Sequence, residues 1–197
     1  MKYLRNYYYL MLLPLLMTAL YLSYTNRAFK NRMGAFTTSL SARSVDQKHN
    51  ILRLTHLIDG IVLKPGERFS FNNWLGPDLA KYDLTPERVI IEGHVTSEVG
   101  GGICQLVSTL YNAALIAGLQ IESRVAHSRN VSSVPSSLDA TVKWGTPDLV
   151  LSNPYTYPIK ISAKQRADQL IVAINGTGQA KFSLARSMDS SGVSKLS

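Results

Sequence analysis

The sequence predicts an α+β fold in which a buried central helix follows a glycine turn and packs against a mainly antiparallel sheet, with a membrane helix at the N-terminus. Three observations predict it: an uncharged run at 7–24, three consecutive glycines at 100–102 before an apolar helical pattern, and short β-type runs after residue 120. A chain of 197 residues is long enough for one domain with a substantial core.

The N-terminal run at 7–24 is close to the minimum length that spans a bilayer, and tyrosines lie at both of its ends. Lys2 and Arg5 precede it and no small-x-small cleavage site follows, which favours a retained signal anchor over 1–26 rather than a cleaved peptide. The next residues, 27–35, are expected to form a linker.

The remaining pattern alternates between a few helical stretches and many short strands. Before the glycines we expect a polar connector or an extended lead-in at 33–48, a helix at 49–62 that ends near Gly60, a strand at 68–71, an irregular loop at 72–88 and a strand at 88–92. After the central helix we expect strands at 120–126, 140–144, 149–152, 159–163 and 170–174, with a hairpin turn at 166–169.

The central helix carries the only cysteine of the chain. The glycines at 100–102 permit a tight turn with positive φ, Leu106 and Leu110 recur at helical spacing, and Gly118 is a natural end. Cys104 therefore lies in the first turn, where unpaired N–H groups and the helix dipole favour a thiolate. The alternative is that Cys104 is a small buried apolar side chain.

The composition narrows the possible partners. The net charge is +8, but the basic residues are scattered without a long Lys/Arg run, so we expect no nucleic-acid partner. A basic domain beside a membrane or an anionic cell wall fits this charge. A single cysteine also excludes an intrachain disulfide framework and a multi-cysteine zinc site.

A cysteine nucleophile needs a base, usually histidine, and often a third group that orients the base. His127 closes an expected strand and opens a polar loop, and Asp139 ends that loop, where it could accept a hydrogen bond from His127. The predicted catalytic set is therefore Cys104, His127 and Asp139. His94, which lies ten residues before the cysteine, is a second histidine that could belong to the site.

Two other chemistries compete for the same residues. Cys104, His94 and His127 could bind zinc, but no pair has the close spacing of structural zinc ligands. The glycine turn lacks the Lys-Ser/Thr pair of a P-loop and is not spaced as a dinucleotide fingerprint. We therefore expect neither a metal nor another cofactor.

Several blocks of the sequence resemble the VanW family in the family's order. They are 65–72 (PGERFSFN), 100–105 (GGGICQ), 110–113, 127–128, 139–142, and Asp148 and Leu149 with Asn153. The resemblance extends from about Phe36 to Gly176, so we expect a VanW domain over 36–178 and a disordered tail over 179–197. Two stretches depart from the family pattern, 107–109 and the loop at 134–138.

The resemblance implies an extracytoplasmic domain that acts on the bacterial cell wall, because some VanW domains look like cysteine-dependent L,D-transpeptidases. By this resemblance Cys104 would carry the family's cysteine, with His127 and Asp139 as candidates for base and orienting group. The residues expected to stabilise an oxyanion or bind substrate are Gly101, Gly102, Gln105, Ser108, Thr109 and His94.

The leading hypothesis is a single-pass, membrane-anchored acyltransferase of the L,D-transpeptidase or L,D-carboxypeptidase type. Its partners would be peptidoglycan stem peptides and, through the N-terminal helix, the membrane. One alternative is a non-catalytic module that binds stem peptides or a partner in cell-wall synthesis or glycopeptide resistance. Another is a cysteine peptidase or amidase that cleaves other bonds. The sequence does not predict an oligomeric state.

Overall fold

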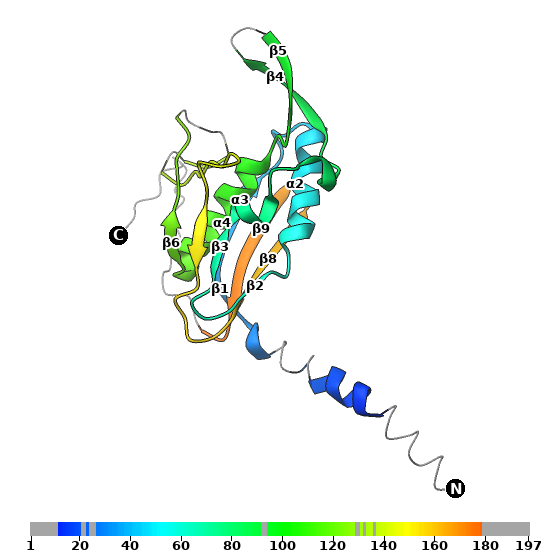
Figure 1. Ribbon diagram of the computed structural model, residues 1–197, viewed down its shortest axis with the longest axis vertical. Coiled ribbons are helices and arrows are strands. Elements are labelled where there is room, and N and C mark those ends of the chain that lie inside the picture. Colours follow the sequence, from blue (N-terminus) through cyan, green and yellow to red (C-terminus); the bar gives the residue numbers. More distant parts are fainter. Residues whose placement is uncertain are drawn as a thin grey trace, which may run out of the picture.

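The computed structural model in Figure 1 describes residues 12–20, 23, 27–91, 94–128, 131, 133–135 and 137–178, and for 87–91 and 94–98 it describes the backbone alone. The helices and strands follow the order β1 (Asn31–Ser39), α2 (Val45–Ile58), β2 (Val62–Leu63), β3 (Arg68–Ser70), α3 (Phe71–Leu75), a 3-10 turn (Ala80–Tyr82), β4 (Pro86–Ile91), β5 (His94–Val99), α4 (Ile103–Ala117), β6 (Gln120–Ser123), β7 (Val150–Ser152), β8 (Ile159–Arg166) and β9 (Gln169–Gly176).

The strands form two sheets and a separate hairpin, and within the described residues all their pairings are antiparallel. The larger sheet has the order β1-β9-β8-β2, and the smaller has the order β3-β7-β6. Helix α4 packs on β1 and β9, and α2 packs on β8. The hairpin of β4 and β5 projects from one end of the domain (Figure 1). The predicted α+β class with antiparallel sheets is confirmed.

The start of the domain differs from the predicted linker at 27–35. This stretch and the connector or extended lead-in expected at 33–48 contain β1, which pairs with β9 from Asn31 opposite Gly176 to Ser39 opposite Gln169. The small and polar residues of β1 give little strand signal by themselves. The strand depends on a partner far away in the sequence and on the helix that covers it.

Helix α4 is the buried central helix that the sequence predicts. It follows Gly102, whose φ is 94°, and ends at Gly118 in the left-handed conformation. A side chain at position 102 would also collide with Ile51, because a Cβ there would lie 2.8 Å from Ile51 Cγ1. The turn therefore needs glycine at 102 for its conformation and for its packing against α2.

The two other helices differ from their predicted ranges. Helix α2 begins four residues early, because Ser44 and Gln47 form a reciprocal capping box. Helix α3 lies mostly in the expected loop at 72–88 and is capped by Ser70. Asp148 fastens this segment by accepting from Ser70 Oγ at 2.6 Å and from the Asn72 amide at 2.9 Å.

The two ends of the chain lie largely outside the described residues. The predicted anchor at 1–26 is described only at 12–20 and 23, and the predicted tail at 179–197 is not described. In the described parts, none of the helices combines the length and the apolar character that crossing a bilayer requires. The membrane anchor stays a prediction.

Candidate functional site

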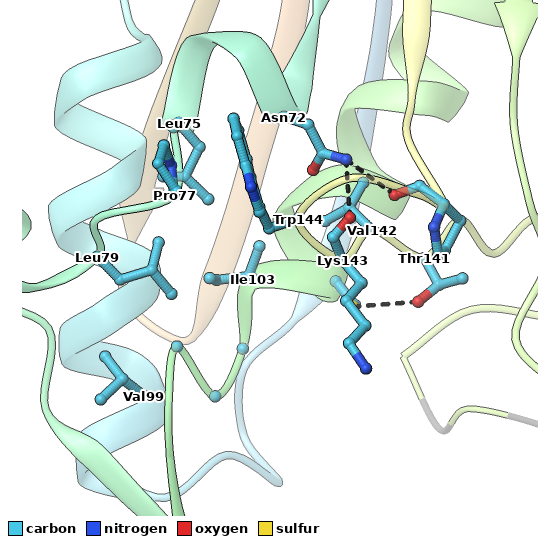
Figure 2. Close-up of a pocket in the computed structure, with 16 residues that line it drawn as sticks. Asn72, Leu75, Pro77, Leu79, Val99, Ile103, Thr141, Val142, Lys143 and Trp144 are labelled. Carbon is cyan, nitrogen blue, oxygen red and sulfur yellow. Dashed lines mark hydrogen bonds between the residues drawn. The ribbon is translucent and has the colours of Figure 1, made fainter.

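Cys104 is a partly exposed side chain in the first turn of α4 and forms part of the wall of two cavities. Its Sγ lies 3.6 Å from Thr141 Oγ1, and either group can donate the hydrogen bond. One cavity has a volume of about 640 Å³ and is bounded by the glycine turn, α3 and the segment 141–147 (Figure 2). The other has a volume of about 280 Å³ and is also lined by Gln105 and His127.

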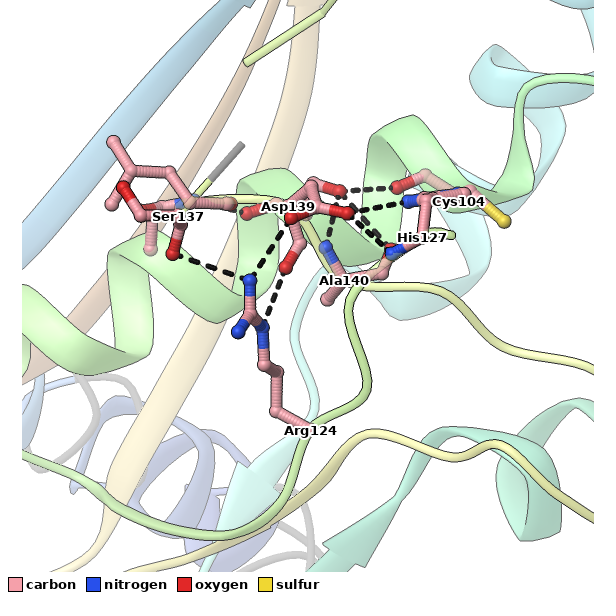
Figure 3. A network of polar contacts seen from close by, with 9 residues as sticks. Cys104, Arg124, His127, Ser137, Asp139 and Ala140 are labelled. Carbon is pink, nitrogen blue, oxygen red and sulfur yellow. Dashed lines mark hydrogen bonds and ion pairs between the residues drawn. The ribbon is translucent and has the colours of Figure 1, made fainter. Parts of the chain in front are cut away.

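His127 and Asp139, which the sequence predicted as neighbours, are in direct contact (Figure 3). The Asp139 Oδ2 atom lies 2.8 Å from His127 Nδ1 and also accepts from the His127 amide at 2.6 Å. A carboxylate can only accept, so Nδ1 carries a proton, and in the uncharged form of the ring Nε2 is then the acceptor. This is the tautomer that a general base requires.

Arg124 holds the carboxyl of Asp139 from the other side. Its Nη2 lies 3.0 Å from Asp139 Oδ1, its Nε donates to the Asp139 carbonyl at 2.6 Å, and Nη2 also donates to the Ser137 carbonyl at 3.2 Å (Figure 3). Burial disfavours the charged form of Asp139, but two hydrogen bonds from His127 and the charge of Arg124 outweigh it, so the pKa of Asp139 is lowered. Asp139 is therefore an ionised, fixed acceptor for the imidazole.

The hydrogen bonds of the glycine turn narrow the choice of oxyanion donor. The Ile103 amide donates to the Gly100 carbonyl at 3.1 Å, and the amides of Gln105 and Leu106 donate to the Gly102 carbonyl. Among the described turn and cap hydrogen bonds of this segment, none uses the amide of Cys104. At the second position of a helix this N–H is directed outward from the helix end.

Three residues that were expected to bind substrate have their side chains in the interior. Ser108 and Thr109 are fully buried, and Gln105 is 4% exposed. The side-chain Nε2 of Gln105 donates to Thr38 Oγ1 and to the Ser39 carbonyl, which ties the start of α4 to the end of β1. We therefore assign Ser108 and Thr109 to the packing of α4 and not to substrate contact.

Ser108 has a particular part in this packing. Its hydroxyl lies 2.8 Å from the Cys104 carbonyl and 3.1 Å from the Ala140 carbonyl, and it accepts from the Ala140 amide at 2.9 Å. It therefore joins the turn of α4 that holds the cysteine to the segment that follows Asp139.

The remaining predicted site residues are Gly101, Gly102 and His94. Gly101 and Gly102 line the larger cavity, and the Gly101 carbonyl accepts from Asn50 Nδ2 at 3.2 Å. His94 begins β5, and its side chain is outside the described part of the structure. In the described part of the chain, no three His, Cys, Asp or Glu side chains are grouped so that they could hold a metal ion.

Acidification is expected to remove the stability that Asp139 contributes. Its pKa in the folded protein lies below the usual value of 3.8, so this stability is present above about pH 4 and is lost as the pH falls through the folded pKa. Urea unfolding between pH 6 and pH 3 should show a steeper loss in the wild type than in Asp139→Asn. Parallel curves for the two proteins would contradict this assignment.

Sequence reasoning missed the contacts of Arg124 and Thr141 at this site. Arg124 follows β6 at an unremarkable position, and its role depends on contacts with residues 137 and 139. Thr141 stood in a predicted strand, but apart from one bridge to Val125 that segment is irregular. Thr141 was part of the family-like block at 139–142, which was the one signal that could have singled it out.

Comparison with known proteins finds the same family that the sequence blocks resemble. Residues 46–175 match the family described as VanW like protein. The chain is 39% identical over 143 residues to YoaR of Bacillus subtilis, described as an uncharacterized protein, and this match covers 73% of the chain and 47% of YoaR. It is 32% identical over 112 residues to the vancomycin B-type resistance protein VanW of Enterococcus faecalis, covering 53% of the chain and 40% of that protein.

The chain thus spans less than half the length of these two relatives. No solved structure matches it significantly. The family match covers most of the described domain and includes the glycine turn, the cysteine and the His127–Asp139 pair. The chain therefore belongs to the VanW family.

Proposed function

We propose that the chain is a cysteine-dependent acyltransferase that acts on peptidoglycan stem peptides, of the L,D-transpeptidase or L,D-carboxypeptidase type. The observation that carries the proposal is the position of Cys104 in the wall of a cavity that His127 also lines, with His127 held by Asp139. A thiol, an oriented imidazole and an adjacent cavity are the parts that acyl transfer through a thioester needs.

In the proposed reaction the Cys104 thiol gives its proton to His127 Nε2, and Sγ attacks the carbonyl carbon of an L,D-peptide bond. The Cys104 amide stabilises the oxyanion that forms. The C–N bond then breaks, the imidazolium returns the proton to the leaving nitrogen, and a D-amino acid departs from a thioester. An acceptor amine or water attacks the thioester and loses a proton to His127, which passes that proton to the departing sulfur, so that the C–S bond breaks and the thiol is restored.

Arg124 and Asp139 act in this scheme as positioning residues. Asp139 fixes the tautomer and the orientation of His127, and Arg124 keeps Asp139 ionised and in place. The proposal also includes location: the segment 1–26 anchors the chain in the cell membrane and the domain lies on its outer side, where stem peptides are found. The uncharged run at 7–24 supports this part.

Muropeptide analysis tests the proposal. Cells that express the full-length wild-type chain are expected to gain 3-3 cross-links or shortened stems, and cells that express Cys104→Ala are not. His127→Gln should reduce the new muropeptides by about 10²-fold or more, the usual effect of losing a general base. His56→Gln, at an exposed position in α2, is the matched control and should have no effect.

A non-catalytic stem-peptide-binding or partner-binding module is the second candidate, and one observation favours it. In the described part of the structure the Cys104 thiol has its hydrogen bond with Thr141 and not with His127. Such a module could serve cell-wall synthesis or glycopeptide resistance, since the Enterococcus faecalis relative is named a vancomycin B-type resistance protein. Identical muropeptides with wild type and Cys104→Ala would favour this candidate over acyl transfer.

A further inference from the structure

The two cavities that Cys104 lines differ in size and in their other lining residues. The larger has a volume of about 640 Å³ and the smaller about 280 Å³, and Gly102 and Cys104 contribute to both. A substrate whose reacting carbonyl lies at Sγ would therefore extend into both cavities. The further inference rests on the proposed function and concerns which part of the substrate each cavity holds.

The position of His127 indicates which part of the substrate each cavity holds. The imidazole must protonate the leaving nitrogen and must later take a proton from the incoming amine or water. His127 lines the smaller cavity and is not among the described residues that line the larger one. The leaving amino acid and the acceptor therefore belong on the smaller side, and the acyl part of the donor peptide belongs in the larger cavity.

The walls of the larger cavity indicate the chemistry of that acyl part. Most of its side chains are apolar, among them Leu75, Leu79, Ile103, Val142 and Trp144. Lys143 is the one charged residue among the described residues that line it, and Figure 2 shows its ammonium end extending away from the apolar wall. Trp144 is 55% exposed beside it. A ligand with an apolar body and an anionic group would match this wall.

The segment that carries Lys143 has a fixed shape. The Lys143 amide donates to the Pro147 carbonyl at 2.9 Å, which closes the loop between them. Asn72 Nδ2 donates to the carbonyls of Lys143 and Pro147 at 2.8 and 3.0 Å (Figure 2). Asn72, in α3, therefore fixes the backbone of the loop that carries the Lys143 side chain.

We propose that the larger cavity is the acyl-donor subsite and that Lys143 recognises a carboxylate on the amino-terminal side of the attacked carbonyl. The attraction between the ligand carboxylate and the Lys143 ammonium does not require the ion pair to be buried. An exposed lysine contributes modestly to binding, and the absence of a competing acid among the described lining residues leaves it available to the ligand. Trp144 and the aliphatic side chains contact the apolar part of the same peptide.

Two synthetic tetrapeptide donors test the subsite. They are identical except that one carries a carboxylate and the other a carboxamide in the acyl part, and formation of the Cys104 thioester on the full-length chain in mild detergent is followed by intact mass. The carboxylate donor should acylate the wild type about fivefold faster, the size expected for one exposed ion pair. Lys143→Gln should bring the two rates within about twofold of each other.

Lys164→Gln is the matched control, since Lys164 is an exposed lysine of β8 that lines neither cavity at the cysteine. This variant should keep the full preference for the carboxylate donor. A preference that is unchanged in Lys143→Gln would overturn the proposal.

A binding measurement separates the subsite from the proposed chemistry. Isothermal titration of the acyl-part tripeptide into full-length Cys104→Ala should give an affinity that falls about fivefold when Lys143→Gln is added. If that loss is seen while the wild type forms no thioester, the subsite stands and acyl transfer is wrong. Equal affinities of Cys104→Ala and of Cys104→Ala with Lys143→Gln would overturn the subsite assignment, even if the wild type forms the thioester.

Discussion

Gly34→Ala is expected to cost about 3 kcal/mol or more of folding stability, because β1 and α4 touch backbone to backbone at this position. A Cβ on Gly34 would lie 2.5 Å from the Ala117 amide nitrogen and 2.6 Å from the Ala113 carbonyl oxygen. Neither atom belongs to a side chain that could rotate away. Relief therefore requires moving the helix off the sheet, which would open the core that the two elements share.

Urea unfolding followed by circular dichroism measures this effect. Gly66→Ala is the matched control, since Gly66 has a φ of 73° and a Cβ there would meet nothing within 4 Å. Gly66→Ala should lose only about 1 kcal/mol of folding stability, because alanine is strained at a positive φ. Equal losses in the two variants would mean that β1 and α4 are not in contact at Gly34.

Arg124→Met is expected to destabilise the domain by about 3 kcal/mol, because it leaves the Asp139 carboxylate buried without its guanidinium partner. The side chain of Asp139 is 3% exposed and that of Arg124 is 23% exposed, and Arg124 also lies over the Tyr111 ring at 5.3 Å. Chemical denaturation at pH 7 gives the free energy of unfolding. The double variant Arg124→Met/Asp139→Asn should recover part of the loss, since the unpaired charge is then gone.

Arg68→Met provides the comparison within the same chain. Arg68 also pairs with a carboxylate, that of Glu122, but its side chain is 66% exposed. Removing an exposed ion pair should cost less than about 1 kcal/mol. If Arg124→Met cost no more than Arg68→Met, the buried network around Asp139 would not be structurally important.

The sequence alone predicted two features of the structure, the helix α4 and the contact between His127 and Asp139. The apolar spacing between two glycines was enough to predict α4, and the positions of His127 and Asp139 at the two ends of one loop were enough to suggest their contact. Both features depend on residues that are close in the chain. The pairing of β1 with β9 spans most of the domain, and no local pattern in the polar stretch around Gly34 reports it.

The polar face of α4 shows why a role is harder to predict for polar side chains near the cysteine. Gln105 and Thr109 are four residues apart and face β1 together, while Ser108 faces Ala140. A row of polar side chains beside a cysteine resembles a binding surface when only the sequence is known. In the fold the Gln105 Nε2 group and the two hydroxyls make buried hydrogen bonds between elements, which sequence spacing does not distinguish from contact with a ligand.

The pairing of Asn31 with Gly176 brings the entrance and the exit of the domain to the same end. From Asn31, β1 rises about 26 Å to Ser39, whose carbonyl is bonded by Gln105 next to the cysteine. A tether or an added module joined at Asn31 or Gly176 would therefore be attached at the opposite end of β1 from the Cys104 sulfur. Such attachments could lengthen or shorten during evolution without steric obstruction of the cavities.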